Sequence, residues 1–101
     1  MEIEIKEFSY ITYIPIRKEM YIRQSRIPLT NFENIFINFI IENNGYCNTN
    51  DFINYLKVFR RTHLKRKCLV VYINRLRNKI YFQTGEKIIK CKYGFGYILN
   101  P

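Results

Sequence analysis

Residues 66–80, with the sequence RKCLVVYINRLRNKI, constrain the fold more than any other part of the chain. The large apolar side chains of this segment recur every three or four residues, which is the spacing of one face of an α-helix. They are Leu69, Ile73, Leu76 and Ile80. Most of the other positions carry arginine, lysine or asparagine, and none carries an acidic residue. The segment therefore predicts a helix that buries one stripe and exposes a cationic face with amide groups.

Such a helix suits the major groove of DNA. That groove is wide enough for an α-helix, and arginine and asparagine side chains read the base edges it presents. The same composition also describes an ordinary surface helix whose charged side chains are solvated. On this segment alone, both interpretations stand on an equal footing.

The positive charge of the chain is concentrated in its C-terminal part. The net charge is +9, and residues 57–101 contain twelve lysines and arginines against a single acidic residue, Glu86. Residues 31–56 contain three acidic residues and no basic one. This asymmetry predicts a face that binds a polyanion, with nucleic acid as the first candidate. An anionic membrane is the second and weaker candidate, because no helix pairs a basic face with a large exposed apolar one, and we expect no membrane partner.

The chain has 101 residues, which is the size of one domain, and apolar residues make up 48% of it. Its cysteines, Cys47, Cys68 and Cys91, lie far apart without a C-x-x-C motif, so we expect free thiols in a reducing cytoplasm. The single histidine, His63, has no neighbouring acid. We therefore expect no enzyme, no metal site and no cofactor.

Residues 1–29 have the character of β-strands. They are rich in isoleucine, tyrosine and phenylalanine, and residues 15–18 and 24–26 are suited to turns. We predict an antiparallel sheet of three to four short strands. The candidate strands are residues 3–5, 8–14, 20–23 and 27–29.

Two further helices are expected before the basic one. Thr30-x-x-Glu33 is a capping box that starts the first helix, and Gly45 stands where a left-handed C-terminal cap belongs. The second helix covers about residues 49–56, with Asn48 or Thr49 as its N-cap. Its first amide groups suit a phosphate, which makes Thr49 a candidate phosphate contact.

A strongly basic segment, residues 57–67, joins the second helix to the third. It is either a solvated loop or a contact for the DNA backbone or a protein partner. Its candidate contact residues in the loop are Arg60, Arg61 and Lys65, followed by Arg66 and Lys67 at the start of the third helix.

Residues 87–99 are predicted to form a β-hairpin after a turn at residues 83–87. The tip is Gly94-Phe95-Gly96, since glycine permits the backbone angles of a tight turn. Lys90 and Lys92 alternate with Ile89 and Cys91, which predicts one basic and one apolar face.

Four motifs follow one another along nearly the whole chain. They are Leu29-Thr30-x-x-Glu33, Asn44-Gly45, Ile73-x-Arg75-Leu76-Arg77-x-Lys79-Ile80 and Ile89-x-x-x-x-Gly94-x-Gly96-Tyr97. In this order they resemble the DNA-binding effector domain of OmpR/PhoB-type response regulators. The resemblance implies an α+β winged helix-turn-helix in one domain, residues 1–101. Its parts are an N-terminal sheet (1–29), three helices (30–80) and a C-terminal hairpin wing (81–101).

The resemblance also implies a function, that of a bacterial transcription regulator of two-component systems. The third helix would enter the major groove of double-stranded DNA, and the wing, residues 89–97, would reach the minor groove or the backbone. The preceding loop would face RNA polymerase. Such domains often bind direct repeats in tandem and are joined to a receiver domain. The chain has no receiver of its own, so we expect an excised domain or a stand-alone regulator.

The candidate contacts fall into three groups. The base contacts are Val71 and Arg75, which the resemblance implies by position, and Asn74 and Asn78, which the chemistry of their amides suggests. The phosphate contacts are Thr49, Arg66, Lys67 and Arg77, of which the resemblance implies Lys67 and Arg77. The wing contacts are Lys90, Cys91, Lys92 and Tyr93, of which the resemblance implies Cys91 and Tyr93.

The chain departs from the family pattern in both contact elements. The third helix has Leu69-Val70-Val71-Tyr72 where the family usually has Val-Asp-Val-His, so it is more cationic. In the wing, Cys91 replaces the usual threonine and Tyr93 replaces arginine or tryptophan. The alternative that the charge pattern leaves open is a module that binds nucleic acid without sequence preference, or an acidic protein.

Overall fold

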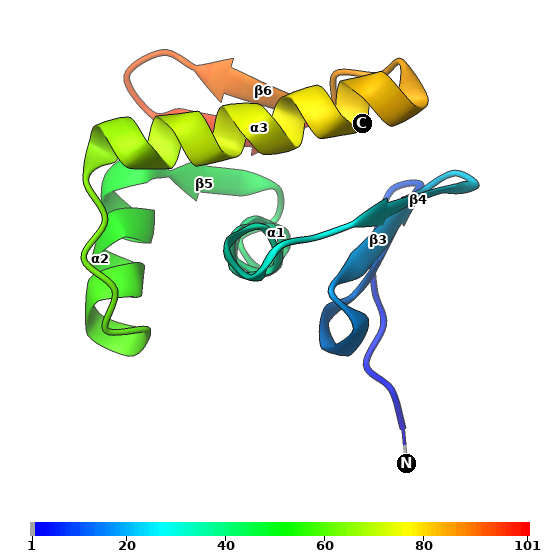
Figure 1. Ribbon diagram of the computed structural model, residues 1–101, viewed down its shortest axis with the longest axis horizontal. Helices are drawn as coiled ribbons and strands as arrows, with labels where there is room; N and C mark the ends of the chain where they lie inside the picture. The colour runs from blue at the N-terminus through cyan, green and yellow to red at the C-terminus, as the bar shows by residue number, and fades with distance from the viewer. Residues whose placement is uncertain (1) are drawn as a thin grey trace.

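The computed structural model describes residues 2–101, and these residues form three α-helices and two antiparallel sheets (Figure 1). The four-stranded sheet has the order β1-β2-β3-β4, and the three-stranded sheet has the order β5-β7-β6. The strands of the first sheet are β1 (Lys6–Phe8), β2 (Ile11–Ile14), β3 (Glu19–Ile22) and β4 (Ser25–Pro28). The remaining elements are α1 (Asn31–Glu42), β5 (Tyr46–Asn48), α2 (Thr49–Phe59), α3 (Arg66–Thr84), β6 (Ile89–Lys92) and β7 (Gly96–Leu99).

The N-terminal sheet is a meander whose alternate side chains point into the core. Tyr13, Met20 and Ile27 face one another across three strands and are fully buried. The predicted sheet is therefore confirmed, but its strand bounds differ. Predicted strand 8–14 is two strands, because Ser9 takes a left-handed conformation (φ 56°) and the chain turns there. Residues 3–5 lie outside the sheet, and β4 already begins at Ser25.

Helix α1 begins at the predicted capping box. The Glu33 amide donates to Thr30 Oγ1 at 3.2 Å, and the Thr30 amide donates to Glu33 Oε1 at 2.9 Å. At the other end the first left-handed residue is Asn44 (φ 58°), and Gly45 (φ 90°) follows it. The Gly45 amide donates to the Ile40 carbonyl at 2.8 Å, which is the bond of a Schellman motif. The predicted role of Gly45 as the left-handed cap thus belongs first to Asn44.

Strand β5 was not anticipated from the sequence. It pairs with β7, with Cys47 opposite Tyr97, so the predicted two-stranded wing is part of a three-stranded sheet. Asn48 then caps α2 by accepting from the Asp51 amide at 3.0 Å. The helix continues to Phe59, about one turn beyond its predicted end.

Helix α3 buries the predicted stripe and is longer than predicted. Leu69, Ile73, Leu76 and Ile80 are all buried. The helix continues to Thr84 and ends where Gly85 adopts φ 74°. The extra turn escaped prediction because its apolar residues do not extend the stripe, and Phe82 is 93% exposed.

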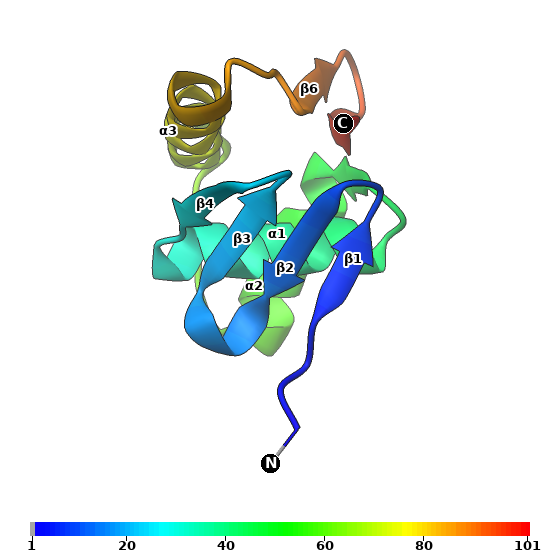
Figure 2. The same ribbon diagram turned by 90° about the vertical axis from the view of Figure 1, so that its right-hand side faces the viewer.

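Helix α1 lies at the centre of the molecule, and α3 crosses above it (Figure 1). The N-terminal sheet covers one side of α1, while α3 and β6 lie together at the opposite end from the N-terminus (Figure 2). Helix α3 packs against α1 and β4. Within the described residues, no helix has the length and apolar character that a membrane crossing requires.

The predicted alternation of faces in the wing is wrong for Cys91. Of the residues of β6 only Ile89 is buried, and Cys91 is exposed together with Lys90 and Lys92. The reason is that β6 is the edge strand of its sheet, and after Ile89 its side chains are not covered; Cys91 helps to line a groove.

We predict that Gly96→Ala unfolds the wing. A Cβ at this position would lie 2.1 Å from the Cys47 carbonyl oxygen and 2.8 Å from the Thr49 nitrogen, at φ 153°. The free energy of unfolding, measured in urea, should fall by about 3 kcal/mol or more. Gly94→Ala is the matched control, because it changes a left-handed glycine (φ 73°) with open space around its Cβ position. It should cost only about 1 kcal/mol, and equal losses in both variants would contradict the prediction.

Candidate nucleic-acid interface

The four predicted base contacts lie on the exposed side of α3. Since the buried stripe fixes the rotation of the helix, residues about half a turn away must point outward. Val71, Asn74, Arg75 and Asn78 are all exposed. The sequence pattern of α3 therefore correctly indicated which side of this helix is free.

Arg75 lies on the exposed flank of α3 next to the start of α1. Its guanidinium carbon is 5.8 Å from the centre of the Tyr72 ring, a cation–π geometry. The Tyr72 ring in turn meets Phe32 of α1 edge to face, with 5.2 Å between ring centres. The long Arg75 side chain is thus supported by aromatic rings and still exposed.

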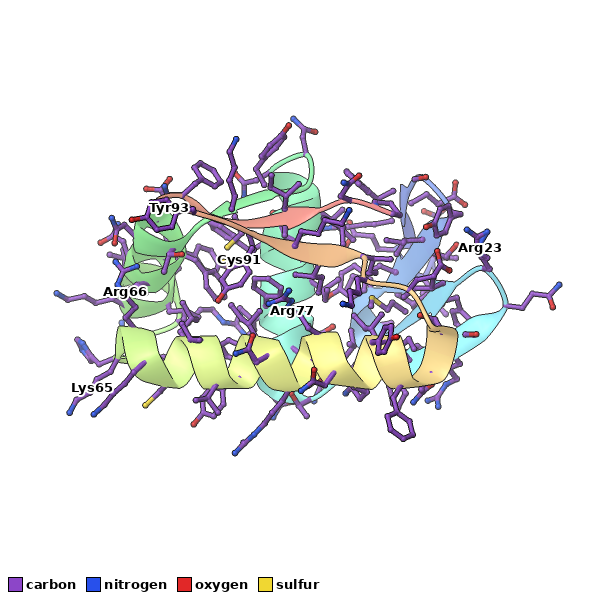
Figure 3. The ribbon with its side chains drawn as sticks, turned by 90° about the horizontal axis from the view of Figure 1, so that it is seen from above. Arg23, Lys65, Arg66, Arg77, Cys91 and Tyr93 are labelled. Atoms are coloured by element: carbon purple, nitrogen blue, oxygen red, sulfur yellow. The ribbon has the colours of Figure 1, made fainter. Side chains whose placement is uncertain are left out.

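Arg77 ties α3 to the wing. Its Nε donates to the carbonyl oxygen of Ile89 at 3.0 Å, and its Nη1 donates to Asn74 Oδ1 at 3.3 Å. Figure 3 shows the Arg77 side chain between the helix and the hairpin. The predicted phosphate contact therefore has a structural role that the sequence did not indicate. Bidentate reading of adenine by Asn74 would require its bond with Arg77 to open.

A groove runs between α3 and the wing. Near the start of α3 it is lined by residues of α2, α3 and the hairpin: Asn50, Arg66, Val70, Cys91, Lys92 and Tyr93. Arg66 donates a hydrogen bond to Asn50 Oδ1, so the first turns of α2 and α3 are joined there. A separate hollow between the second half of α3 and the start of the wing is lined by Asn74, Arg77, Asn78, Tyr81 and Lys87. Most of these polar groups are hydrogen-bond donors.

Thr49 does not lie where a phosphate contact was predicted. It is buried, and its amide donates to the Phe95 carbonyl at 3.0 Å. The exposed residues of the first turn of α2 are Asn50 and Asp51. Because Asp51 is acidic, this helix end is less favourable to an anion than the sequence suggested.

The four predicted wing contacts are exposed together. Lys90, Cys91 and Lys92 lie on β6, and Tyr93 at the tip is fully exposed. The Lys92 ammonium lies 5.6 Å from the centre of the Phe95 ring. Tyr93 and Arg66 lie toward the same end of the groove (Figure 3). The wing thus presents two cations and one free aromatic ring beside α3.

The loop between α2 and α3 exposes its predicted contacts Arg60, Arg61 and Lys65, and Lys67 on α3 is exposed as well. The Thr62 amide donates to the Leu56 carbonyl at 2.9 Å, which folds the loop back on the end of α2. Val58 and Phe59, which the sequence reasoning did not single out, are also exposed, Phe59 by 73%. The signal was present, because both follow the last buried residue of α2 and directly precede two arginines.

Two acidic side chains near α3 form ion pairs away from its outward face. Buried Glu33 pairs with Lys79 on the α1 side of α3, and Glu86 pairs with Arg23 of the N-terminal half. Within residues 2–101, the other cations of α3 and the wing form no ion pair. These are Arg66, Lys67, Arg75, Arg77, Lys90 and Lys92. Their uncompensated charge makes one end of the molecule strongly positive.

No known family profile matches the sequence, and no curated protein matches it.

In the part of the chain that the structure describes, no three His, Cys, Asp or Glu side chains are grouped as a metal site would need. The function must therefore be inferred from the charges and geometry of α3 and the wing.

We predict that the cysteines differ sharply in reactivity. Cys91 is exposed, whereas burial raises the pKa of the Cys47 thiol to about 12. A thiol-specific reagent at pH 8 should modify Cys91 within minutes, and Cys47 only after unfolding, because the thiolate is the reactive form. Mass spectrometry of the peptides would measure both rates, with Cys91→Ser as the control. Rapid modification of Cys47 in the folded protein would contradict the structure.

Proposed function

We propose that this chain is a winged helix-turn-helix domain that binds double-stranded DNA sequence-specifically and regulates transcription. The observation that carries the proposal is the joint exposure of α3 and the wing at one end of the molecule. Both elements carry cations without acidic partners, and α3 adds amide groups. The resemblance to OmpR/PhoB-type effector domains supports this function, and the four-stranded N-terminal sheet is consistent with it.

In this proposal α3 enters the major groove. Lys67, Arg66 and the wing lysines neutralise phosphates and supply most of the affinity through release of counterions. Arg75, Asn74 and Asn78 read base edges, and Val71 meets the methyl group of a thymine. Arg75 is the strongest candidate for reading guanine, because its supported and exposed guanidinium is free for a bidentate contact.

The wing would follow the backbone or the minor groove next to α3. Lys90 and Lys92 point outward from its free edge strand, and Tyr93 extends from the tip. Arg77 holds the hairpin at a fixed distance from the helix. Two elements held in this way contact neighbouring parts of a duplex at the same time.

The exposed Val58 and Phe59 at the end of α2, beside Arg60 and Arg61, favour a protein contact at the end of α2 and in the loop before α3. In a transcription regulator this partner would be RNA polymerase. A receiver domain in a longer chain and a second copy on direct repeats are further proposed partners. Binding of nucleic acid without sequence preference, or of an acidic protein through the same basic face, is the alternative function.

We predict tight binding to duplex DNA that weakens steeply with salt. The wild type should prefer duplex DNA to single strands and RNA at two salt concentrations, measured by fluorescence anisotropy. Lys90→Ala and Lys92→Ala should each lower the slope of log K against log salt by about 1, because each removes one phosphate contact. Arg17→Ala, in the β2–β3 connection, is the matched control and should leave the slope unchanged. Equal affinity for single strands and duplexes would favour the alternative function.

We predict that Arg75→Ala reduces specificity. Affinity for the best duplex selected from a random pool should fall by about 1–3 kcal/mol, with one base position becoming degenerate. Binding to random duplex DNA should change far less. Lys67→Ala is the comparison, since loss of a phosphate contact weakens all sequences alike. Equal losses on selected and random DNA for Arg75→Ala would make Arg75 a phosphate contact instead.

A further inference from the structure

Three side chains from distant parts of the chain meet at the C-terminal end of α3. Glu86 directly follows the Gly85 cap, and its carboxylate accepts hydrogen bonds from two turns of the N-terminal sheet. Tyr10 Oη donates to Glu86 Oε1 at 2.8 Å. Arg23 donates from Nε to Oε2 at 3.1 Å and from Nη2 to Oε1 at 3.2 Å. We call these three residues the Glu86 clamp.

The partners of Glu86 are themselves held in place. The Arg23 guanidinium lies 4.1 Å from the centre of the Tyr10 ring, and the Arg23 amide donates to the Tyr10 carbonyl at 3.3 Å. The hydrogen bond from the Tyr10 hydroxyl is the largest effect that lowers the pKa of the Glu86 carboxyl, and the hydrogen bonds and charge of Arg23 lower it further. Glu86 is also oriented by its own amide, which donates to Thr84 Oγ1 at 3.0 Å.

The clamp lies at the junction between α3 and the wing. Residues 87–88 lead directly from Glu86 into β6. At the far side of this short connection the Ile88 carbonyl accepts from the Asn100 amide at 2.7 Å, and the Ile89 carbonyl accepts from Arg77. The connection is therefore fixed at its start by Glu86 and at its end by Arg77. Arg23 lies at the opposite end of α3 from Arg66 and Tyr93 (Figure 3).

We infer that the Glu86 clamp sets the position of the wing relative to α3 and thereby determines how many phosphates the two elements contact together. Glu86 is a positioning residue, and it makes no contact with DNA. This inference depends on the proposed function. It explains why the single acidic residue of the basic half is placed at this junction, with its charge directed into the N-terminal sheet.

The test uses Glu86→Gln, which keeps the shape of the side chain and removes its charge. Its amide group would place a donor against Arg23, so the connection to the wing should loosen. Affinity for random-sequence duplex DNA should fall about five- to tenfold, and the salt slope should decrease by about 1–2 as Lys90 and Lys92 lose their phosphates. Without DNA, hydrogen exchange of the β6 amides should become faster, while exchange in β2 and β3 stays unchanged.

Glu19→Gln is the matched control. Glu19 pairs with Arg26 at 2.6 Å in the same N-terminal sheet, but away from the α3–wing junction. It should lower thermal stability as Glu86→Gln does, and leave the DNA affinity, the salt slope and the exchange of β6 unchanged. If both variants lowered the affinity equally, Glu86 would have only a general structural role and the inference would be overturned.

A charge reversal completes the test. Arg23→Glu and Glu86→Arg should each weaken binding, and the double variant should recover much of the affinity and the slow exchange of β6. Tyr10→Phe, which removes one hydroxyl group, should also lower the DNA affinity and speed the exchange of the β6 amides, but by less than Glu86→Gln. It serves as the test if Glu86→Gln does not fold. The inference would be overturned if the β6 amides of folded Tyr10→Phe, and of the folded Arg23 and Glu86 variants, exchanged hydrogen at the wild-type rate.

The two proposals fail in different ways. If the wild type did not bind duplex DNA, the proposed function would fail, and with it the functional role of the clamp, whatever the exchange of β6 showed. If the wild type bound duplex DNA and Glu86→Gln had the same affinity and salt slope, the clamp would fail while the proposed function stood.

Discussion

The burial of one side of α3 holds the helix against the core and orients its polar side chains. Four aliphatic side chains of this helix are fully buried against α1 and the N-terminal sheet, each contributing about 2 kcal/mol by removal from water. Their burial fixes the rotation of the helix, so it decides which polar side chains remain outside. Arg75 and Asn78 are exposed for this reason alone. The cationic face of α3 is thus a consequence of packing on its other side.

The three-stranded sheet anchors the base of the wing to the core. Strand β5 ties the hairpin to the end of α1 and the start of α2, and the Thr49 amide closes the contact by bonding to the Phe95 carbonyl. Gly96 is required because any side chain there would meet the β5 backbone. The base of the wing is therefore part of the core, while its edge strand β6 exposes Lys90 and Lys92, of which Lys92 lines the groove.

The distribution of charge follows the same division. Two acidic residues near α3 form ion pairs, and both pairs lie away from the groove. Glu33 pairs with Lys79, and Glu86 pairs with Arg23. These pairs bind α3 to the N-terminal half and leave its outward cations uncompensated. A polyanion would meet positive charge on α3 and on the wing together, while the N-terminal sheet would remain outside the contact.

Features that depend on neighbouring residues could be read from the amino-acid sequence: the capping box at Thr30, the buried stripe of α3, the glycine tip of the hairpin and the concentration of positive charge. These could be predicted because helix periodicity, capping and turn formation are local. Tertiary structure alone decided the rest: strand β5, the burial of Thr49, the exposure of Cys91, the bond from Arg77 to the wing and the meeting of Tyr10, Arg23 and Glu86. Each of these depends on a partner that is remote in the sequence, and no local pattern specifies which remote segments meet.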